Sequence, residues 1–197
     1  MEKDKVRSGT PTSYNPSVAA LLNEGLDTLF WVPKRSAALR PWREHVPFAH
    51  WLTAVTRPLV LVDSGENLGV SFAAFCEGTL KSQSGGRCYA IAPQTIISAN
   101  AGTRNEAFGD VDGLIQEHYG SFADLIEEAP DEAIRLFQDG TIDLLHLGGE
   151  RPNEALRDQF AHWLPKLSSR GVVLIHGTNI KDPHAGVGQD RKSTRLN

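Results

Sequence analysis

The segment 58–71, PLVLVDSGENLGVS, constrains the fold of this chain more than any other. A short apolar run, LVLV, ends at Asp63, and a loop with Gly65 and Gly69 then leads into an apolar helical run over 70–80. This pattern is typical of a buried parallel strand that passes into a helix, whose first backbone amides can hold a polar ligand. The segment therefore predicts an α/β fold with a ligand site at the end of its first strand.

The same alternation continues downstream and predicts a doubly wound, mostly parallel sheet. Short apolar runs rich in branched residues are typical of parallel strands that are covered on both faces. Strands are predicted at 59–63, 88–92, 142–147 and 172–176, with a weaker one at 125–128. Helices are predicted between them at 70–81, 110–119, 131–138 and 153–167.

The chain divides into three parts. Residues 1–40 are predicted to form an N-terminal arm that contains a short helix candidate over 18–30. Residues 41–188 form the folded domain. Residues 189–197 end in DRKSTRLN, which resembles a translated sequencing-library adapter, so we interpret them as a non-native tail. The native protein is then expected to continue beyond about Gly188.

The folded domain opens with the aromatic segment PWREHVPFAHW. Trp42, Phe48, Trp51 and Leu52 are predicted to form one packing face of this segment. Because the net charge is acidic, we expect the tryptophans to pack in the protein rather than to stack on nucleic-acid bases.

Composition excludes several classes of function. The 197 residues carry a net charge of -4 and no dense Lys/Arg stripe, so no nucleic-acid partner is expected. The apolar runs are far shorter than the roughly 18–20 residues of a membrane span and no signal peptide is recognised, so no membrane span is expected and a cytoplasmic location is predicted. The two cysteines, Cys76 and Cys88, are predicted to be buried free thiols, as in a reducing compartment.

Residues at the strand ends are the candidates for a site, because ligands bind beyond the carboxyl ends of parallel strands. Gly65 lets the turn approach a ligand closely, and Gly69 lets the following helix pack tightly. Their G-x-x-x-G spacing differs from the G-x-G-x-x-G of dinucleotide sites, which disfavours a nicotinamide-dependent oxidoreductase. A tight strand–helix turn without a ligand is the alternative interpretation.

Two histidines close the fourth and fifth predicted strands. His146 and His176 could face a common cleft, where an imidazole would take a proton from a substrate hydroxyl. The alternative is a partly buried histidine that is bonded to the backbone. The sequence contains no Ser/His/Asp triad signature, Cys/His metal spacing or phosphate loop, and it identifies no catalytic residue.

Several stretches carry a family resemblance: HVPFAHWL, LVDSGENLGVSFAAFC, CYAIA, FQDGTIDLLHLGG, EALRDQFAHWLPKLSSRGVVLIHGTN and a trailing GV. With them, residues from about Trp42 to Val187 resemble class I S-adenosylmethionine-dependent methyltransferases. More narrowly, they resemble the small methyltransferase-like domains found beside glycosyltransferases in bacterial surface-polysaccharide pathways. The resemblance implies a Rossmann-like methyltransferase fold, whose C-terminal strands are expected to be missing from this chain.

The resemblance also implies a place for the cofactor. S-adenosylmethionine would lie over the carboxyl ends of the first strands. The cofactor-binding residues are predicted to be Asp63, Ser64, Gly65, Glu66, Gly69, Ser71, Ala92 and Gly148.

Three positions depart from the pattern of these domains. The acid that binds the ribose hydroxyls is replaced by Ala92, and acids after the fourth and fifth strands are replaced by Gly148 and Gly177. A charge-assisted hydrogen bond is worth roughly 1.5–3 kcal/mol, so the missing ribose acid alone weakens binding by about ten- to a hundredfold. No metal is expected, because Mg²⁺ needs hard oxygen ligands and these residues offer none from their side chains.

The resemblance therefore implies a methyltransferase that acts on a small molecule or a sugar. The retained glycine loop and Asp63 favour this activity. The missing acids favour the alternative, which is a catalytically inactive methyltransferase-fold module for binding or scaffolding in a polysaccharide-biosynthesis protein. The acceptor and the oligomeric state are not fixed by the sequence.

Overall fold

The computed structural model describes residues 42, 44–65, 68–93, 111–148 and 153–176. The predicted arm over 1–40 and the predicted tail over 189–197 lie outside them. The strands are β1 (Val60–Ser64), β2 (Arg87–Ile91), β3 (Ala123–Ile126), β4 (Ile142–Leu147) and β5 (Leu167–Ile175). The longer helices are α3 (Val46–Thr56), α4 (Leu68–Ser82) and α8 (Asn153–Trp163). The short helical segments are α6 (Val111–Leu114), η1 (Ile115–Tyr119), α7 (Pro130–Ala133), η2 (Ile134–Leu136) and η3 (Leu164–Lys166).

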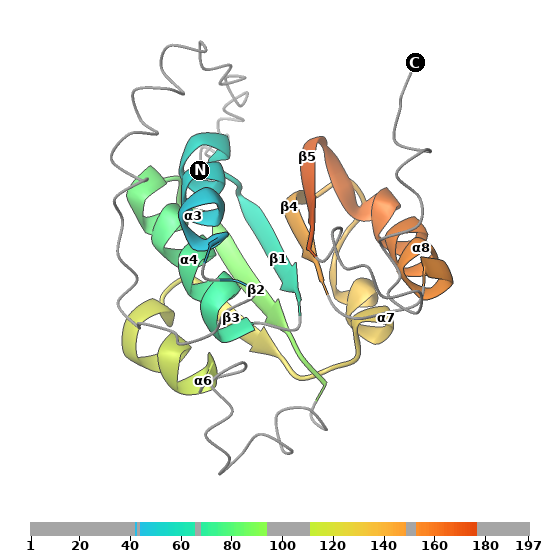
Figure 1. Cartoon of the computed structure of the whole chain (residues 1–197), viewed down its shortest axis with the longest axis horizontal. Helices are drawn as coiled ribbons and strands as arrows, with labels where there is room; N and C mark the ends of the chain where they lie inside the picture. Colours follow the sequence, from blue (N-terminus) through green and yellow to red (C-terminus); the bar gives the residue numbers. More distant parts are fainter. Residues whose placement is uncertain (1–41, 43, 66–67, 94–110, 149–152, 177–197) are drawn as a thin grey trace, which may run out of the picture.

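The strands form one parallel sheet in the order β3-β2-β1-β4-β5, which confirms the predicted doubly wound α/β fold. From β1 the chain runs outward to β2 and β3, and it then returns to the other side of β1 to add β4 and β5 (Figure 1). The order therefore reverses between β1 and β4. In such sheets a crevice opens outside the carboxyl ends of the strands at the reversal, and ligands bind there.

Helices cover both faces of this sheet. The helices α3, α4 and α6 lie on one side, and α7 and α8 lie on the other (Figure 1). Because successive side chains of a strand alternate, Leu61 and Leu144 join the core cluster under α3 and α4, whereas Val62 and Leu145 join the cluster that contains Trp163 of α8. Burial on both faces explains why the strands are continuous apolar runs in the sequence.

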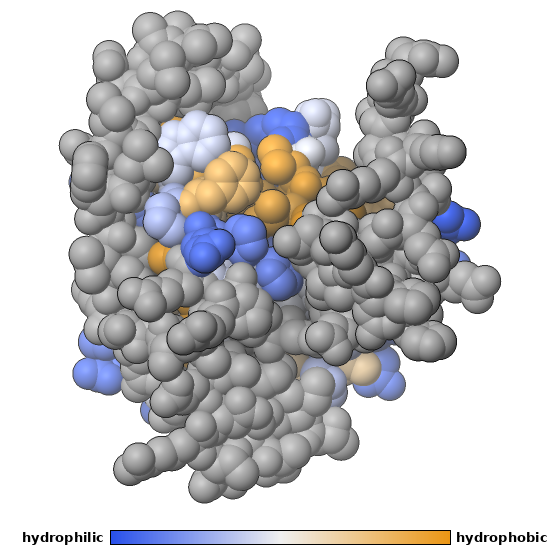
Figure 2. Space-filling view, viewed as in Figure 1, coloured by the Kyte–Doolittle hydropathy of each residue, from blue (hydrophilic) through white to orange (hydrophobic). Residues whose placement is uncertain are grey.

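The strand β5 forms an edge of the described sheet. Its apolar side chains are half-buried: Val172, Val173, Leu174 and Ile175. Figure 2 shows apolar side chains gathered near the middle of the face seen in Figure 1, between the helices of the two sides. The described sheet is thus less completely covered at β5 than at β4, where every residue is buried.

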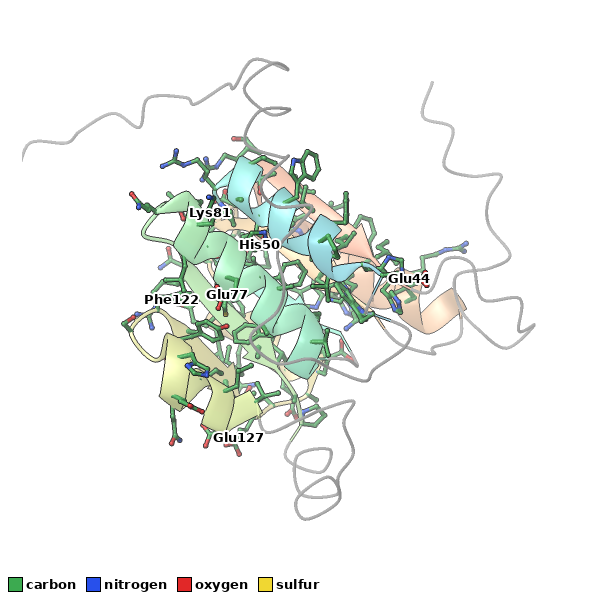
Figure 3. All side chains as sticks on the ribbon, turned by 60° about the vertical axis from the view of Figure 1, so that its left-hand side comes forward. Glu44, His50, Glu77, Lys81, Phe122 and Glu127 are labelled. Atoms are coloured by element: carbon green, nitrogen blue, oxygen red, sulfur yellow. The ribbon has the colours of Figure 1, made fainter. Side chains whose placement is uncertain are left out.

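The helices α3 and α4 approach each other closely at Gly78. A Cβ at residue 78 would lie 2.6 Å from the carbonyl oxygen of His50 and 2.6 Å from Cβ of Thr53, so this helix contact requires glycine. His50 is buried here, beside Glu77 and Lys81 of α4 (Figure 3). Burial lowers the pKa of the His50 imidazole, which favours its neutral form in the folded protein.

The predicted and observed elements differ mainly at their ends. The weak strand predicted at 125–128 is β3, and the helix predicted over 110–119 ends as the π-helix η1. The helix predicted over 153–167 ends at Trp163 as α8, because Pro165 lacks a backbone N–H and the chain passes through η3 into β5. Local periodicity finds these elements, whereas their ends depend on turns and on strand pairing.

The aromatic segment forms α3, a helix that the sequence pattern does not predict. Trp42, which precedes α3, is buried. Phe48 is 46% exposed, so the prediction that it shares one packing face with Trp42, Trp51 and Leu52 is wrong. The predicted proximity of Phe48 to Trp51 is confirmed, because their ring centroids lie 5.9 Å apart.

Two expectations about the environment of the chain can be compared with the structure. Cys76 and Cys88 are buried free thiols, as predicted. Burial raises the pKa of the Cys76 thiol, so it stays protonated. Within the described ranges, no helix combines the length and the apolar character that crossing a bilayer requires.

Candidate functional site

The carboxyl ends of β1 and β4 meet where the strand order reverses. In the parallel register Asp63 is the partner of His146, and Ser64 is the partner of Leu147. Asp63 and His146 both point to the face covered by α3 and α4, because they share the alternation of Leu61 and Leu144. Both side chains are completely buried.

The Asp63 carboxylate accepts hydrogen bonds from three elements. Its Oδ2 accepts from the hydroxyl of Ser71 in the first turn of α4 at 2.6 Å, and its Oδ1 accepts from the backbone N–H of Gly65 at 3.0 Å. Nδ1 of His146 lies 2.7 Å from the same Oδ1. Because a carboxylate only accepts hydrogen bonds, Nδ1 is the nitrogen that carries a proton. Asp63 thus ties β1, its loop, α4 and β4 together.

The ring of His146 leaves no room for a side chain at residue 65. A Cβ there would lie 2.5 Å from Cε1 and 2.9 Å from Nδ1 of His146, and 3.2 Å from Oδ1 of Asp63. The first two distances are shorter than any van der Waals contact between such atoms. The sequence explains Gly65 by close approach to a ligand, and the structure adds a second reason, which is the histidine.

Gly148 follows β4 and lies beside Gly65. A Cβ at residue 148 would lie 3.4 Å from Gly65 Cα, 3.4 Å from Nε2 of His146 and 3.4 Å from Cβ of His176. The two glycines therefore bring the backbone after β1 close to the backbone after β4 with no side chain of their own between them. A molecule bound at this edge would meet peptide groups at both positions.

Aromatic and imidazole rings enclose the buried histidine. The ring centroid of Trp42 lies 4.9 Å from that of His146 and 5.5 Å from that of His176. Phe75 of α4 lies 5.5 Å from His146, and His45 lies 5.3 Å from His176. Segments from before α3, from α4 and from after β5 thus converge on the reversal point.

Three buried polar atoms at this edge have no hydrogen-bond partner within the described part of the chain. They are Nε2 of His146, Nε1 of Trp42 and Oγ of Ser64. Such an atom costs about 1–3 kcal/mol when it stays unpaired, and folded proteins pair the large majority of them. Unpaired donors and acceptors at the reversal point are groups with which a polar ligand can pair.

The structure brings together most of the residues predicted for the cofactor site. Those at the ends of β1 and β4 and in the first turn of α4 form one cluster: Asp63, Ser64, Gly65, Gly69, Ser71 and Gly148. Ala92 follows β2, and its backbone N–H donates to the carbonyl oxygen of Ile126 at 3.0 Å. Glu66 lies outside the described residues.

The sequence suggests two roles for His146, and the structure contradicts one of them. The ring is fully buried and bonds a carboxylate, so it is not a partly buried histidine bonded to the backbone. One sequence signal could have found this pair, because both residues stand at the ends of predicted parallel strands and on the same face. The place of Trp42 beside His146 has no such signal, since nothing in the local pattern links the two.

The positions that lack the expected acids differ in their surroundings. Ala92 is 3% exposed and belongs to the core cluster under α3 and α4, and Gly148 is buried. Gly177 lies outside the described residues. Among the residues described, no group of three or more His, Cys, Asp or Glu side chains could hold a metal ion.

Comparison with known families identifies one match. A family of proteins described as "Methyltransferase domain" matches residues 62–178, which is more than half of the chain. The match begins within β1. It includes the predicted cofactor residues that form one cluster: Asp63, Ser64, Gly65, Gly69, Ser71 and Gly148. It also includes Ala92 and Gly177.

The chain is also similar to individual proteins. It is 30% identical over 148 residues to the uncharacterized protein y4gI of Sinorhizobium fredii. The matched region makes up 75% of this chain and 16% of that protein. It is similar to the SAH-bound methyltransferase PaMTH1 of Podospora anserina, with a TM-score of 0.55, 16% identity, and coverage of 85% of this chain and 65% of the other. It is also similar to the O-methyltransferase of Bacillus cereus in complex with SAH, with a TM-score of 0.54 and 12% identity. The similarity covers 83% of this chain and 68% of the other. At these identities the two solved structures show the fold alone, which is Rossmann-like.

Proposed function

The chain belongs to the methyltransferase domain family, and from this premise we propose that it binds S-adenosylmethionine and methylates a small-molecule or sugar acceptor. One observation carries the proposal. At the reversal point of the sheet, the Asp63 carboxylate accepts hydrogen bonds from the Gly65 N–H and the Ser71 hydroxyl, and so holds the residue after β1 and the first turn of α4 in place. Holding these residues in advance favours binding of a nucleoside ligand, because the ligand does not have to fix their positions when it binds.

The residues at this edge fit such a cofactor in three ways. Gly65 and Gly148 offer backbone groups rather than side chains, and Ser64 has a hydroxyl that pairs with no described residue. The first turn of α4 presents backbone N–H groups that favour a carboxylate. In this proposal Asp63 and Ser71 shape the site without contacting the cofactor, because the Asp63 carboxylate is buried and already hydrogen-bonded to Ser71.

When bound, S-adenosylmethionine supplies a methyl group on a positively charged sulfur. The protein contributes mainly by holding the two reactants in line, which lowers the entropic part of the barrier. On the acceptor side we place His176, which is half-buried and in ring contact with Trp42 and His45. In this proposal its imidazole accepts the proton of an acceptor hydroxyl.

A second candidate function is favoured by one observation. Ala92 stands where the sequence resemblance implies an acid for the ribose, and its side chain is packed into the core under α3 and α4. The matched region is also only part of a larger protein in y4gI, of which this chain spans 16%. A catalytically inactive binding or scaffold module within a polysaccharide-biosynthesis protein is therefore the alternative.

Calorimetric titration tests the proposal. We expect the chain to bind S-adenosylhomocysteine and S-adenosylmethionine with micromolar dissociation constants, weaker by about ten- to a hundredfold than a site with its ribose acid. NADH serves as the control ligand and is expected to give no heat, because the glycine spacing is not that of a dinucleotide site. Absence of heat at millimolar S-adenosylhomocysteine would contradict the proposal and support the scaffold.

A further inference from the structure

We propose that His146 is a positioning residue of the cofactor site, which holds Asp63 and thereby keeps its two other hydrogen-bond partners, Gly65 and Ser71, in their binding positions. This inference rests on the proposed function and deepens it. It assigns to a residue of β4 a role in positioning residues that follow β1, although the two strands are far apart in the sequence.

A hydrogen bond joins the buried side chains of Asp63 and His146. Oδ1 of Asp63 has two partners, the backbone N–H of Gly65 at 3.0 Å and Nδ1 of His146 at 2.7 Å. Without the imidazole, a carboxylate of zero exposure would keep only Gly65 on that oxygen. The carboxylate could then rotate, and Gly65 and Ser71 would lose their fixed positions.

The ring of His146 also restricts the space at Gly65. The ring of His146 occupies the place where a side chain at residue 65 would lie, at 2.5 Å from Cε1. The ring itself is held by contacts with Trp42 and Phe75, whose centroids lie 4.9 Å and 5.5 Å away. The backbone of Gly65 is thus confined by a ring that cannot move aside easily.

The geometry distinguishes positioning from direct proton transfer. Nδ1 is already engaged with Asp63, and Nε2 is buried, 3.4 Å from the position that a Cβ at residue 148 would occupy. His146 therefore acts on the site through Asp63 and the ring contacts. A base in the reaction would instead need Nε2, which both variants below remove, so that a base role predicts the same loss of activity in the two.

Two substitutions separate the hydrogen bond from the bulk of the ring. In His146→Asn the amide nitrogen takes the place of Nδ1 and can still donate to Asp63, whereas Cε1 and Nε2 are removed. In His146→Leu the apolar volume is largely kept and the donor is lost. We expect the leucine variant to bind S-adenosylhomocysteine at least about tenfold more weakly and the asparagine variant to stay within about threefold of the unaltered chain.

A double substitution tests the steric argument. Gly65→Ala alone is expected to weaken binding of S-adenosylhomocysteine at least about tenfold and to lower the melting temperature, because of the contact with Cε1. Combining it with His146→Asn should restore part of both losses, since Cε1 is then absent. His118→Asn, at an exposed histidine of η1, is the matched control and should change neither quantity.

The outcomes separate this inference from the function on which it rests. If the unaltered chain and His146→Leu bind equally well, or if the asparagine and leucine variants lose affinity equally, the inference is contradicted while the proposed function stands. If the unaltered chain does not bind, the proposed function fails, and the melting temperatures still decide whether Gly65 and His146 are coupled. Additive changes in melting temperature would contradict the coupling.

Discussion

Replacing Asp63 by alanine is expected to lower the free energy of unfolding by about 3–5 kcal/mol and to abolish binding of S-adenosylhomocysteine. The substitution removes the acceptor for the Ser71 hydroxyl, the Gly65 N–H and Nδ1 of His146, all of which lie in the buried cluster. Each donor left unpaired in such a place costs more than the hydrogen bond contributed. Thermal unfolding should show a decrease of about 6–20 °C in melting temperature for a chain of this length.

Two further variants keep this prediction testable if the alanine variant does not fold. Asp63→Asn has the same shape and one remaining acceptor oxygen, so it should fold with a smaller loss of stability. Asp139→Ala is the control, because its carboxylate is 73% exposed and pairs with Lys166 at the surface, where such pairs contribute about 0–1 kcal/mol. A loss of under about 1 kcal/mol for both Asp63 variants would show that the network does not stabilise the fold.

A second large effect is expected near the amino-terminal ends of the strands, away from the candidate site, where Asp143→Ala should lower the free energy of unfolding by about 2–4 kcal/mol without changing the affinity for S-adenosylhomocysteine. Asp143 accepts from the backbone N–H of Leu59 at 2.8 Å, from Ser168 at 2.6 Å, and from Nε and Nη2 of Arg170 at 3.0 Å and 2.8 Å. It thus joins the start of β4 to the chain before β1 and to β5. Urea denaturation of the variant measures the loss.

The contribution of Asp143 should also depend on pH. Burial alone would raise the pKa of its carboxyl, but hydrogen bonds from Arg170, Ser168 and Leu59 outweigh burial, and the pKa in the folded protein is lowered. Because the unfolded chain then binds the proton more readily, the stabilisation is complete above the unfolded pKa and is lost as the pH falls through the folded pKa. The difference between the unaltered chain and Asp143→Ala should therefore be constant from pH 7 to about pH 5 and shrink below about pH 4.

Asp124→Ala provides the matched control for this second prediction. Asp124 pairs with Arg87 between β2 and β3, and both side chains are 47% exposed, so this removal of an acid from an Arg–Asp pair should cost under about 1 kcal/mol. Equal losses for the two aspartate variants, or a difference that grows toward acid pH, would contradict the role given to Asp143.

The sequence predicts the fold well because the fold depends on local patterns. Strands buried on both faces appear as short apolar runs, and glycine-rich turns separate them from helices, so the parallel α/β sheet follows. The end of β1 was identifiable for the same reason, since Asp63 and Gly65 come directly after an apolar run. The helix α3 was not identifiable, because the exposed Phe48 obscures the apolar stripe by which a helix is predicted.

The site itself could be predicted only as a place, not as a set of contacts. The enclosure of Asp63 depends on its pairing with His146 across two strands that are distant in the sequence. The position of Trp42 against that histidine depends on how the segment before α3 folds back over the sheet. Such contacts arise from topology, and no local spacing of residues encodes them.

The central claim is that the glycine backbone at the ends of β1 and β4 holds the cofactor, and backbone amide resonances of the ¹⁵N-labelled chain test it most directly. On addition of S-adenosylhomocysteine, the amides of Gly65 and Gly148 should shift strongly, whereas that of Gly140, in an exposed turn before β4, should not. Unchanged Gly65 and Gly148 resonances at saturating ligand, or shifts confined to other parts of the chain, would contradict the account.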